Sequence, residues 1–273
     1  MNISNKPDWL NKKVKGFLLD VNGVLYDSGL DGGTAIPGSV DAIDRLVELR
    51  IPFRLCSNET QHTRSSLLAT LQKLGFNVNL HNILTPAPIV AEELKKRMLR
   101  PYLLVHPKLK DEFRNLDQSE PNCVVVGDAA DSFTYDNLNQ AFRLLINSTE
   151  PKLFSMGTGK FYKEANGLML DLGAFTKALE YACDITAEIF GKPTEKYFLA
   201  ALDSLNLKAD EVVMIGDDIV SDVGGAQNCG IRAVQVKTGK WRNEWIEHPI
   251  VKPDAYMPNL FACVQCVLEY NNF

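Results

Sequence analysis

Short apolar runs alternate with segments of helical periodicity along this chain, and this alternation strongly limits the folds that it can adopt. The first run, Val14–Leu19, closes on Asp20, and a second run covers Pro52–Cys56. A strand that helices cover on both faces has this appearance. The intervening Ser39–Leu49 carries apolar residues at helical spacing, with Ser39 as the expected N-cap. Strands that alternate with helices predict a parallel, doubly wound α/β sheet.

The alternation continues through the rest of the chain. Further strands are expected at Tyr102–Val105, Cys123–Val126, Lys152–Met156, Val212–Ile215 and Arg232–Val236. Further helices are expected at Thr63–Leu74 (closed by Gly75), Tyr135–Ile146, Phe175–Cys183, Tyr197–Leu205, Ala226–Cys229 and Leu260–Leu268. Prolines near positions 86 and 193 punctuate the pattern. We therefore predict two domains, a core of residues 1–85 and 190–273 and an inserted α/β cap of residues 86–189.

Composition excludes several classes of protein. Lys and Arg number 29 against 34 Asp and Glu, so the formal net charge is −5. Nucleic acids and anionic membranes favour a basic face, so we expect neither as a partner. The chain has no apolar run of about 18 residues, and its start lacks the apolar region of a signal peptide. We therefore expect a cytoplasmic protein. Six cysteines are too few for a disulfide scaffold at this length. We therefore interpret the Cys263-x-x-Cys266 pair as buried thiols.

Polar side chains follow three of the expected strands. Asp20 to Gly23 follow the first, Ser57-Asn58 the second, and Gly216 to Asp218 a later one, while Lys192 lies in a Gly-Lys-Pro turn. Chemistry in open α/β sheets collects beyond the carboxyl ends of the strands. Oxygen ligands there suit Mg²⁺, a lysine suits a phosphoryl group, and an aspartate can act as the nucleophile.

The order of these motifs is similar to that of a known family. D-x-N-G-V at Asp20–Val24, Ser57-Asn58, G-K-P at Gly191–Pro193 and G-D-D-x-x-x-D at Gly216–Asp222 resemble the haloacid dehalogenase superfamily of phosphatases. Longer strings, such as LLDVNGVLYDSG and MIGDDIVSDVGGAQ, extend the resemblance over nearly the full length. It is greatest to the branch with an α/β cap inserted in mid-chain, which includes the 4-nitrophenylphosphatase-like enzymes. The resemblance implies a Rossmann-like core with such a cap.

The resemblance also implies a magnesium site. Asp20 would be both the nucleophile and a ligand, and the backbone carbonyl of Asn22 and the carboxylate of Asp217 would be the other ligands. Asp218 and Asp222 would orient these ligands and hold water molecules from outside the coordination sphere.

The implied phosphate site uses further residues of the same motifs. The transferred phosphoryl group would contact Ser57, Asn58 and the Asp20-Val21-Asn22 segment, and Lys192 would neutralise its charge. Positioning and charge neutralisation are the main requirements of a loose phosphoryl transition state. Asp20, Asn22 and Lys192 are thus the expected catalytic set.

One residue departs from the superfamily pattern. Most of its phosphatases carry a second aspartate two residues after the nucleophile, as general acid and base, where this chain has Asn22. An amide cannot donate a proton and take it back, and such help contributes about 10²–10⁴-fold. We therefore expect substrates with good leaving groups, and the resemblance implies inorganic pyrophosphate and P–N bonds in phospholysine, phosphohistidine or imidodiphosphate.

Two alternative functions remain open from the sequence. The chain could be a phosphomonoesterase of the same branch that acts on small metabolites, or a non-enzymatic protein that binds phosphorylated ligands, as Asn22 would permit. The resemblance further implies a homodimer through the cap and the nucleus as a second compartment. Lys160, Tyr162 and Lys163 are interpreted equally well as substrate contacts from the cap and as a solvated turn.

Overall fold

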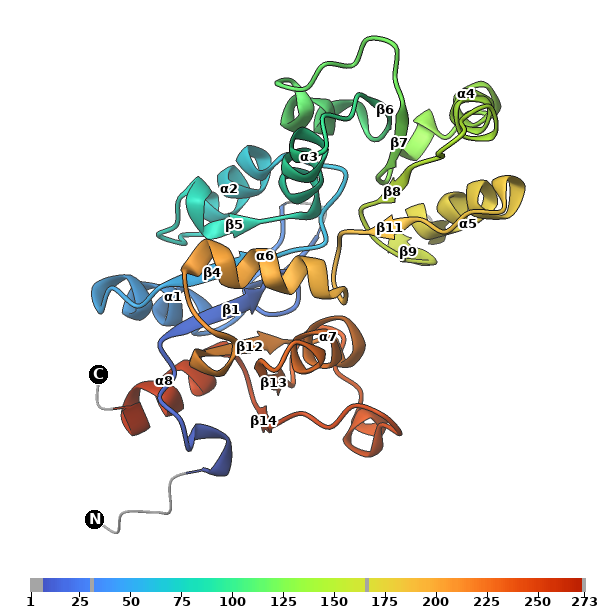
Figure 1. Ribbon diagram of the computed structural model, residues 1–273. Helices are drawn as coiled ribbons and strands as arrows, with labels where there is room; N and C mark the ends of the chain where they lie inside the picture. The colour runs from blue at the N-terminus through green and yellow to red at the C-terminus, as the bar shows by residue number, and fades with distance from the viewer. Residues whose placement is uncertain (1–6, 30–31, 165–166, 272–273) are drawn as a thin grey trace, which may run out of the picture. The chain divides into compact units, whose positions relative to one another are not determined.

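The computed structural model describes residues 7–29, 32–164 and 167–271, and these residues form two compact units (Figure 1). Unit 1 contains the described residues of Met1–Ser57, Ser65–Leu84 and Phe198–Phe273. Unit 2 contains Asn58–Arg64 and the described residues of Thr85–Tyr197. Unit 2 thus holds the described residues of the predicted cap, 86–189, together with a loop at 58–64, Thr85 and residues 190–197.

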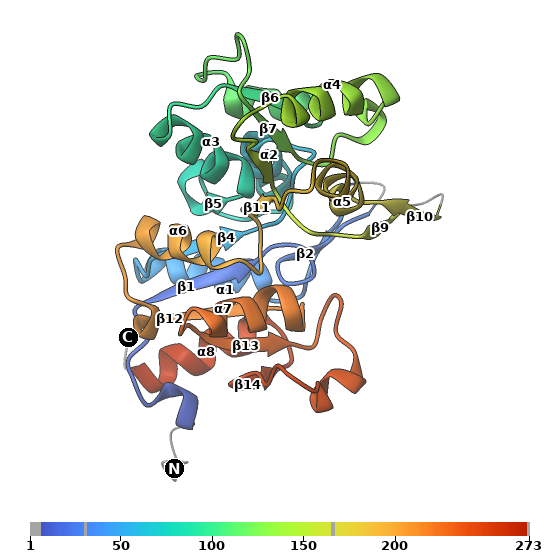
Figure 2. The ribbon, with the colours of Figure 1, turned by 45° about the vertical axis from the view of Figure 1, so that its right-hand side comes forward.

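A six-stranded parallel sheet forms the centre of unit 1, with the order β14-β13-β12-β1-β4-β5 (Figure 2). Its strands are β1 (Gly16–Asp20), β4 (Phe53–Cys56), β5 (Ile83–Leu84), β12 (Val212–Gly216), β13 (Arg232–Val236) and β14 (Ala255–Met257). Leu19 pairs with Ile215, so the carboxyl ends of β1 and β12 lie side by side. All the strands end at the same edge, as the predicted doubly wound α/β sheet requires.

Helices cover both faces of this sheet. The helices of this unit are α1 (Ser39–Glu48), α2 (Arg64–Lys73) except its first residue, α6 (Glu195–Leu205) except its first three residues, α7 (Gly225–Asn228) and α8 (Leu260–Asn271). Buried side chains of α1, α2 and α8, such as Leu46, Leu71 and Val267, share one core with Phe17 and Leu19 of β1. The views in Figures 1 and 2 show α6 and α7 on the other side of the sheet. Gly75 follows α2 with φ of +95°, which confirms the predicted left-handed helix stop.

The prediction that Ser39 caps α1 was wrong. Gly38, with φ of +81°, is the N-cap, and Ser39 is the first residue of the helix. The buried Ser39 hydroxyl lies 2.7 Å from the carbonyl oxygen of Leu25 and 2.6 Å from that of Ile36. The hydroxyl therefore joins the helix to the preceding loop, and the left-handed glycine makes the turn into the helix.

Unit 2 is built on a four-stranded parallel sheet with the order β11-β8-β7-β6. Its elements are α3 (Pro86–Lys96), β6 (Pro101–Leu104), β7 (Cys123–Val126), α4 (Tyr135–Ile146), β8 (Leu153–Ser155), α5 (Leu172–Cys183) and β11 (Glu188–Ile189). An antiparallel hairpin of β9 (Phe161–Glu164) and β10 (Gly167–Leu170) projects beside them. The bounds of β7 and α4 are those predicted. Helix α3 was not among the predicted elements: Pro86 at its start resembles a domain-boundary signal, but proline also fits the first turn of a helix.

The remaining elements are short. They are β2 (Tyr26–Asp27), β3 (Thr34–Ala35), a π-helical turn at Ile219–Gly224, and 3₁₀ turns at Asp8–Leu10, Leu80–Asn82, Pro107–Phe113, Ala130–Ser132, Ala209–Glu211 and Asn243–Glu247. No described helix combines the length and apolar composition that a membrane span requires. All six cysteines are free thiols, and Cys263 is fully buried on α8, where burial raises the pKa of its thiol.

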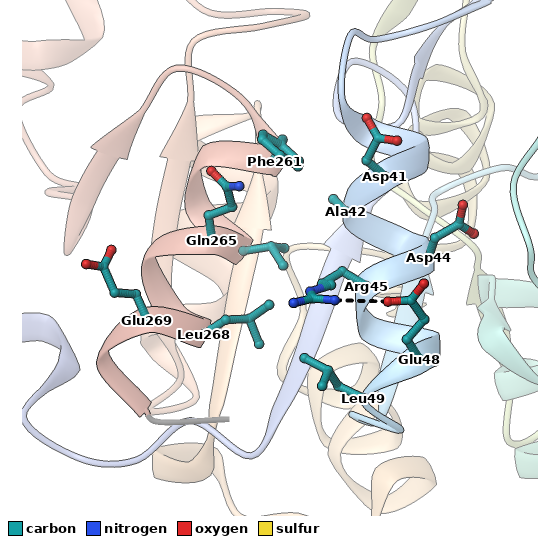
Figure 3. A pocket seen from close by; sticks show the side chains of 11 residues that line it. Asp41, Ala42, Asp44, Arg45, Glu48, Leu49, Phe261, Gln265, Leu268 and Glu269 are labelled. Atoms are coloured by element: carbon teal, nitrogen blue, oxygen red, sulfur yellow. Dashed lines mark hydrogen bonds and ion pairs between the residues drawn. The ribbon is translucent and has the colours of Figure 1, made fainter.

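A groove of about 770 Å³ runs between α1 and α8 (Figure 3). Its lining comes from these two helices and the residue after α1: Asp41, Ala42, Asp44, Arg45, Glu48, Leu49, Phe261, Val264, Gln265, Leu268 and Glu269. Arg45 is the one basic side chain of this lining and forms an ion pair with Glu48 at 3.1 Å. The groove contains none of the polar side chains that follow the strands, so it is separate from the predicted site.

Candidate active site

Three aspartates of unit 1 gather at the carboxyl edge of its sheet. Asp20 is the last residue of β1, and Asp217 directly follows β12. The π-helical turn that begins at Ile219 brings Asp222 back to the same edge. One carboxylate oxygen of each residue lies within 4.8 Å of the others, and all three residues are buried. We call Asp20, Asp217 and Asp222 the carboxylate cluster.

The environment of Asp217 shows what the cluster could hold. Its Oδ2 accepts the backbone N–H of Lys240 at 2.6 Å. Its Oδ1 is buried and has no hydrogen-bond partner among the residues that the structure describes. A buried polar atom without a partner is costly, and an ion bound there would remove that cost.

The electrostatics of the cluster also favour a cation. Burial, together with the charges of Asp20 and Asp222, raises the pKa of Asp217 to about 8. Like charges this close oppose one another's ionisation unless a positive charge lies between them. Buried carboxylate oxygens are ligands that Mg²⁺ prefers, so these residues fit the ion that the motif order implied.

Asp222 lies inside the cluster, whereas the prediction assigned it to the residues around the ligands. Its Oδ2 accepts the backbone N–H of Asp218 at 3.1 Å. A Cβ at Gly216 would collide with the Asp222 side chain, so the end of β12 needs a glycine there. Asp222 therefore ties the turn after β12 to the strand end as well as adding a carboxylate to the cluster.

Asp218 has a different set of contacts. Its Oδ1 accepts the backbone N–H groups of Val220 at 3.0 Å and Ser221 at 2.9 Å, and its Oδ2 pairs with Lys240 Nζ at 3.0 Å. Burial raises the pKa of Asp218, but the Lys240 charge and these hydrogen bonds outweigh burial and lower it. The carboxylate stays ionised and caps the turn that carries Asp222.

Asn58 and Lys192 are joined to each other within unit 2. Asn58 Oδ1 accepts the backbone N–H of Lys192 at 2.8 Å, and Asn58 Nδ2 donates to the Lys192 carbonyl at 3.0 Å. A Cβ at Gly191 would collide with the carbonyl of Met156, so the Gly-Lys-Pro turn packs closely here. The sequence suggested that Asn58 contacts phosphate, and the structure shows that it holds the backbone of the turn that carries Lys192.

The other predicted phosphate contacts lie in unit 1. Ser57 is buried, and its N–H donates to the carbonyl of Leu84 at the end of β5, at 3.0 Å. Val21 is buried, whereas Asn22 is exposed. Asn22 Nδ2 donates to the Ser28 hydroxyl at 3.3 Å, and Asn22 Oδ1 accepts the Ser28 backbone N–H at 3.3 Å. Asn22 thus closes its own loop through its side chain.

Lys240 is a residue of the site that the sequence motifs do not predict. Its backbone and its ammonium contact Asp217 and Asp218 respectively. Burial lowers the pKa of the ammonium, but the charges of Asp218, Asp217 and Asp20 outweigh burial and raise it. Lys240 lies in the loop that follows β13, and only the folded path of this loop reveals its contacts with the cluster.

A polar network in unit 2 involves one residue that the sequence left open. Gln61 Nε2 donates to Asp128 Oδ2 at 2.7 Å and to the Tyr162 hydroxyl at 3.0 Å. Asp128 follows β7, and its N–H donates to the Thr60 hydroxyl at 3.3 Å. Tyr162 is thus part of the network that joins loop 58–64 to the cap sheet. The side chain of Lys163 lies outside the described residues.

Comparisons with known proteins identify the family of this chain. A family model described as haloacid dehalogenase-like hydrolase matches residues 17–119, and one described as HAD-hydrolase-like matches residues 189–263. The chain is 52% identical to phospholysine phosphohistidine inorganic pyrophosphate phosphatase of Danio rerio and 51% identical to that of Homo sapiens. Each alignment covers 94% of this chain and 95% of the relative.

The fold is similar to solved structures of phosphatases. The 4-nitrophenylphosphatase of Thermotoga maritima superposes with a TM-score of 0.83 at 26% identity, over 93% of this chain and 97% of that chain. The p-nitrophenyl phosphatase of Archaeoglobus fulgidus has the same TM-score at 24% identity, over 93% and 99%, which supports the fold alone. The α/β architecture with a second α/β unit is therefore shared with these enzymes.

Proposed function

Because this chain belongs to the haloacid dehalogenase-like hydrolase family, we propose that it is a magnesium-dependent phosphohydrolase acting on pyrophosphate and P–N bonds. The observation that carries the proposal is the buried carboxylate cluster, in which Asp217 Oδ1 has no hydrogen-bond partner among the described residues. The names of its half-identical relatives supply the substrate class.

Asp20 is the nucleophile in this proposal. Its carboxylate oxygen attacks phosphorus, the bond from phosphorus to the leaving oxygen or nitrogen breaks, and an aspartyl-phosphate forms on Asp20. Water then attacks this phosphorus and releases inorganic phosphate, which restores the carboxylate. Mg²⁺ bound by Asp20, Asp217 and the Asn22 carbonyl would neutralise the phosphoryl oxygens. Asp222 would add its negative charge to those of Asp20 and Asp217 in holding the ion.

Other residues bind and orient the phosphoryl group. We assign this role to Ser57, to the Val21-Asn22 backbone and to the ammonium of Lys192, by their places in the motif order. The hydrogen bonds between Asn58 and the Lys192 backbone support a positioning role for Asn58. Fixed charges of this kind stabilise the transition state without reorganising during the reaction.

The proposed substrate class fits the replacement of the usual general acid by Asn22. Asn22 cannot protonate a leaving group, and its side chain is already paired with Ser28. Pyrophosphate leaves as phosphate, and the nitrogen of a phosphoramidate can be protonated by solvent, so both need little help from the enzyme. Alkyl phosphates need more, because their leaving alkoxides are strongly basic.

A phosphomonoesterase of small metabolites is the second candidate. The 26% identity and the TM-score of 0.83 to a 4-nitrophenylphosphatase support it. Nitrophenolate is also a good leaving group, so turnover of that ester alone would not separate the two candidates. We further propose a cytoplasmic location, with the nucleus as a second compartment, and a homodimer formed through unit 2.

Phosphate release from a panel of substrates tests the proposal. The panel contains pyrophosphate, imidodiphosphate, phospholysine, phosphohistidine and an alkyl phosphate, each with Mg²⁺ and with a chelator. We expect Mg²⁺-dependent release, faster from the first four than from the alkyl ester. Asp20→Asn should abolish release while circular dichroism shows an unchanged fold. Retained turnover by Asp20→Asn would refute the nucleophile, and a preference for alkyl esters would favour the second candidate.

A further inference from the structure

The loop after β13 reaches across the sheet edge to the loops after β1 and β12. The Thr238 hydroxyl donates to the Gly23 carbonyl at 2.6 Å, and the Lys240 N–H donates to Asp217 Oδ2 at 2.6 Å. The N–H of Lys237 donates to the Met257 carbonyl at 2.9 Å and anchors the base of the loop beside β14. The short segment Lys237–Lys240 therefore contacts the chain at the carboxyl ends of β1, β12 and β14.

Two glycines enclose the same carboxylate oxygen. Gly23 and Gly239 have φ of +84° and +58°, and a Cβ on either would collide with Asp217 Oδ2. A Cβ on Gly239 would also lie only 2.6 Å from the Gly23 Cα. The two glycine backbones thus lie so close to Oδ2 that a residue with a Cβ atom would not fit at either position.

The two oxygens of Asp217 consequently differ. Oδ2 is held by an N–H and enclosed by glycine backbones, whereas Oδ1 is buried with no hydrogen-bond partner in the described part of the chain. Rotation of the carboxylate would exchange these environments, and the enclosure of Oδ2 opposes it. Lys240 strengthens the arrangement because its ammonium pairs with the neighbouring Asp218 at 3.0 Å.

We propose that Gly23, Thr238, Gly239 and Lys240 form a clamp that holds Asp217 Oδ2 and presents Oδ1 to the metal ion. These four are positioning residues, since they act through Asp217. The inference rests on the proposed function, because it requires that the carboxylate cluster binds a divalent cation. Groups that orient metal ligands commonly change metal affinity about 10–100-fold when they are altered.

Metal titration of the full-length Gly239→Ala variant tests the clamp. We expect its Kd for Mn²⁺, measured by electron paramagnetic resonance after chelation and dialysis, to rise by about 10–100-fold. Gly230→Ala is the matched control, because Gly230 has φ of +73° but only Ala209 Cβ, at 3.9 Å, near its Cβ position. It carries the same kind of backbone strain without a collision at Asp217, so its Kd should equal that of the wild type.

A second variant covers the case in which Gly239→Ala does not fold. Thr238→Val removes the hydroxyl that binds the Gly23 carbonyl and should raise the Kd by about 2- to 10-fold. The thermal shift that Mg²⁺ produces should shrink in both loop variants and remain in Gly230→Ala. Loop variants that are folded and bind Mn²⁺ like the wild type would overturn the clamp alone. A wild type that binds no Mn²⁺ would overturn the magnesium site and the clamp together.

Discussion

The buried position of Asp217 shifts the pKa of its carboxyl group. Its ordinary pKa is 3.8, and burial beside Asp20 and Asp222 raises it to about 8. Between these two pH values, the folded and metal-free protein keeps a proton that the unfolded chain has released. The unfolded state then binds fewer protons, so the free energy of unfolding falls as pH rises through this window.

We therefore expect the metal-free protein to lose stability from pH 5 to pH 8, relative to Asp217→Asn. The difference should reach up to about 1.4 kcal/mol per pH unit, the value of one proton. Urea denaturation in the presence of a chelator measures it. The comparison with Asp217→Asn is necessary because carboxylates of lowered pKa, such as Asp218, contribute the opposite slope at lower pH.

Saturating Mg²⁺ provides the control for this prediction. Binding of the ion would require the ionised form of Asp217, so the stabilisation by Mg²⁺ should increase with pH up to about 8. A difference between wild type and Asp217→Asn that does not change with pH would show that Asp217 is already ionised without metal.

At the scale of elements, amphipathic spacing decides which side chains stabilise the unit. Helix α1 places Leu46 fully in the core, whereas its neighbour Val47 is 37% exposed. Leu46→Ala should leave a cavity and lower the free energy of unfolding by about 2–5 kcal/mol. Val47→Ala, in the same turn, should change it by about 0.5 kcal/mol or less. Urea denaturation of both variants tests the prediction, and equal effects would contradict the assigned helix face.

The same spacing explains which elements could be predicted. Tyr135–Ile146 and Cys123–Val126 have clear patterns, and they form α4 and β7 at the predicted bounds. Helix α3 begins Pro-Ala-Pro, and the two-residue strand β5 is too short for any period to show. Such elements are stabilised by packing against their neighbours and carry little local signal.

At the scale of the whole molecule, an exposed apolar face supports the proposed homodimer. Phe161 pairs with Leu170 across the β9–β10 hairpin of unit 2, and Leu168 lies two residues away on the same face. Phe161 is 60% exposed, Leu170 63% and Leu168 68%. An apolar face on a short hairpin is typical of a surface that another protein covers.

Sedimentation velocity can test this proposal. The wild type should sediment at twice the monomer mass of 30.4 kDa. The double variant Leu168→Glu/Leu170→Glu should sediment as a monomer, since four carboxylates would meet in a symmetric interface. Ile250→Glu alters a similarly exposed residue of unit 1 and should remain dimeric. A monomeric wild type would refute the dimer, and a dimeric double variant would locate the interface elsewhere.

The parallel α/β architecture and two of the three clustered carboxylates could be predicted from the amino-acid sequence alone. Asp20 is the last residue of β1 and Asp217 directly follows the neighbouring strand β12, and the carboxyl ends of parallel strands lie at one edge of a sheet. The hydrogen-bond partners of the site residues, in contrast, become visible only in the folded chain. Asn58 binds the backbone of Lys192, and Lys240 reaches Asp217 across the sheet edge. These contacts depend on the paths of loops between distant parts of the chain, and no local period or propensity encodes such a path.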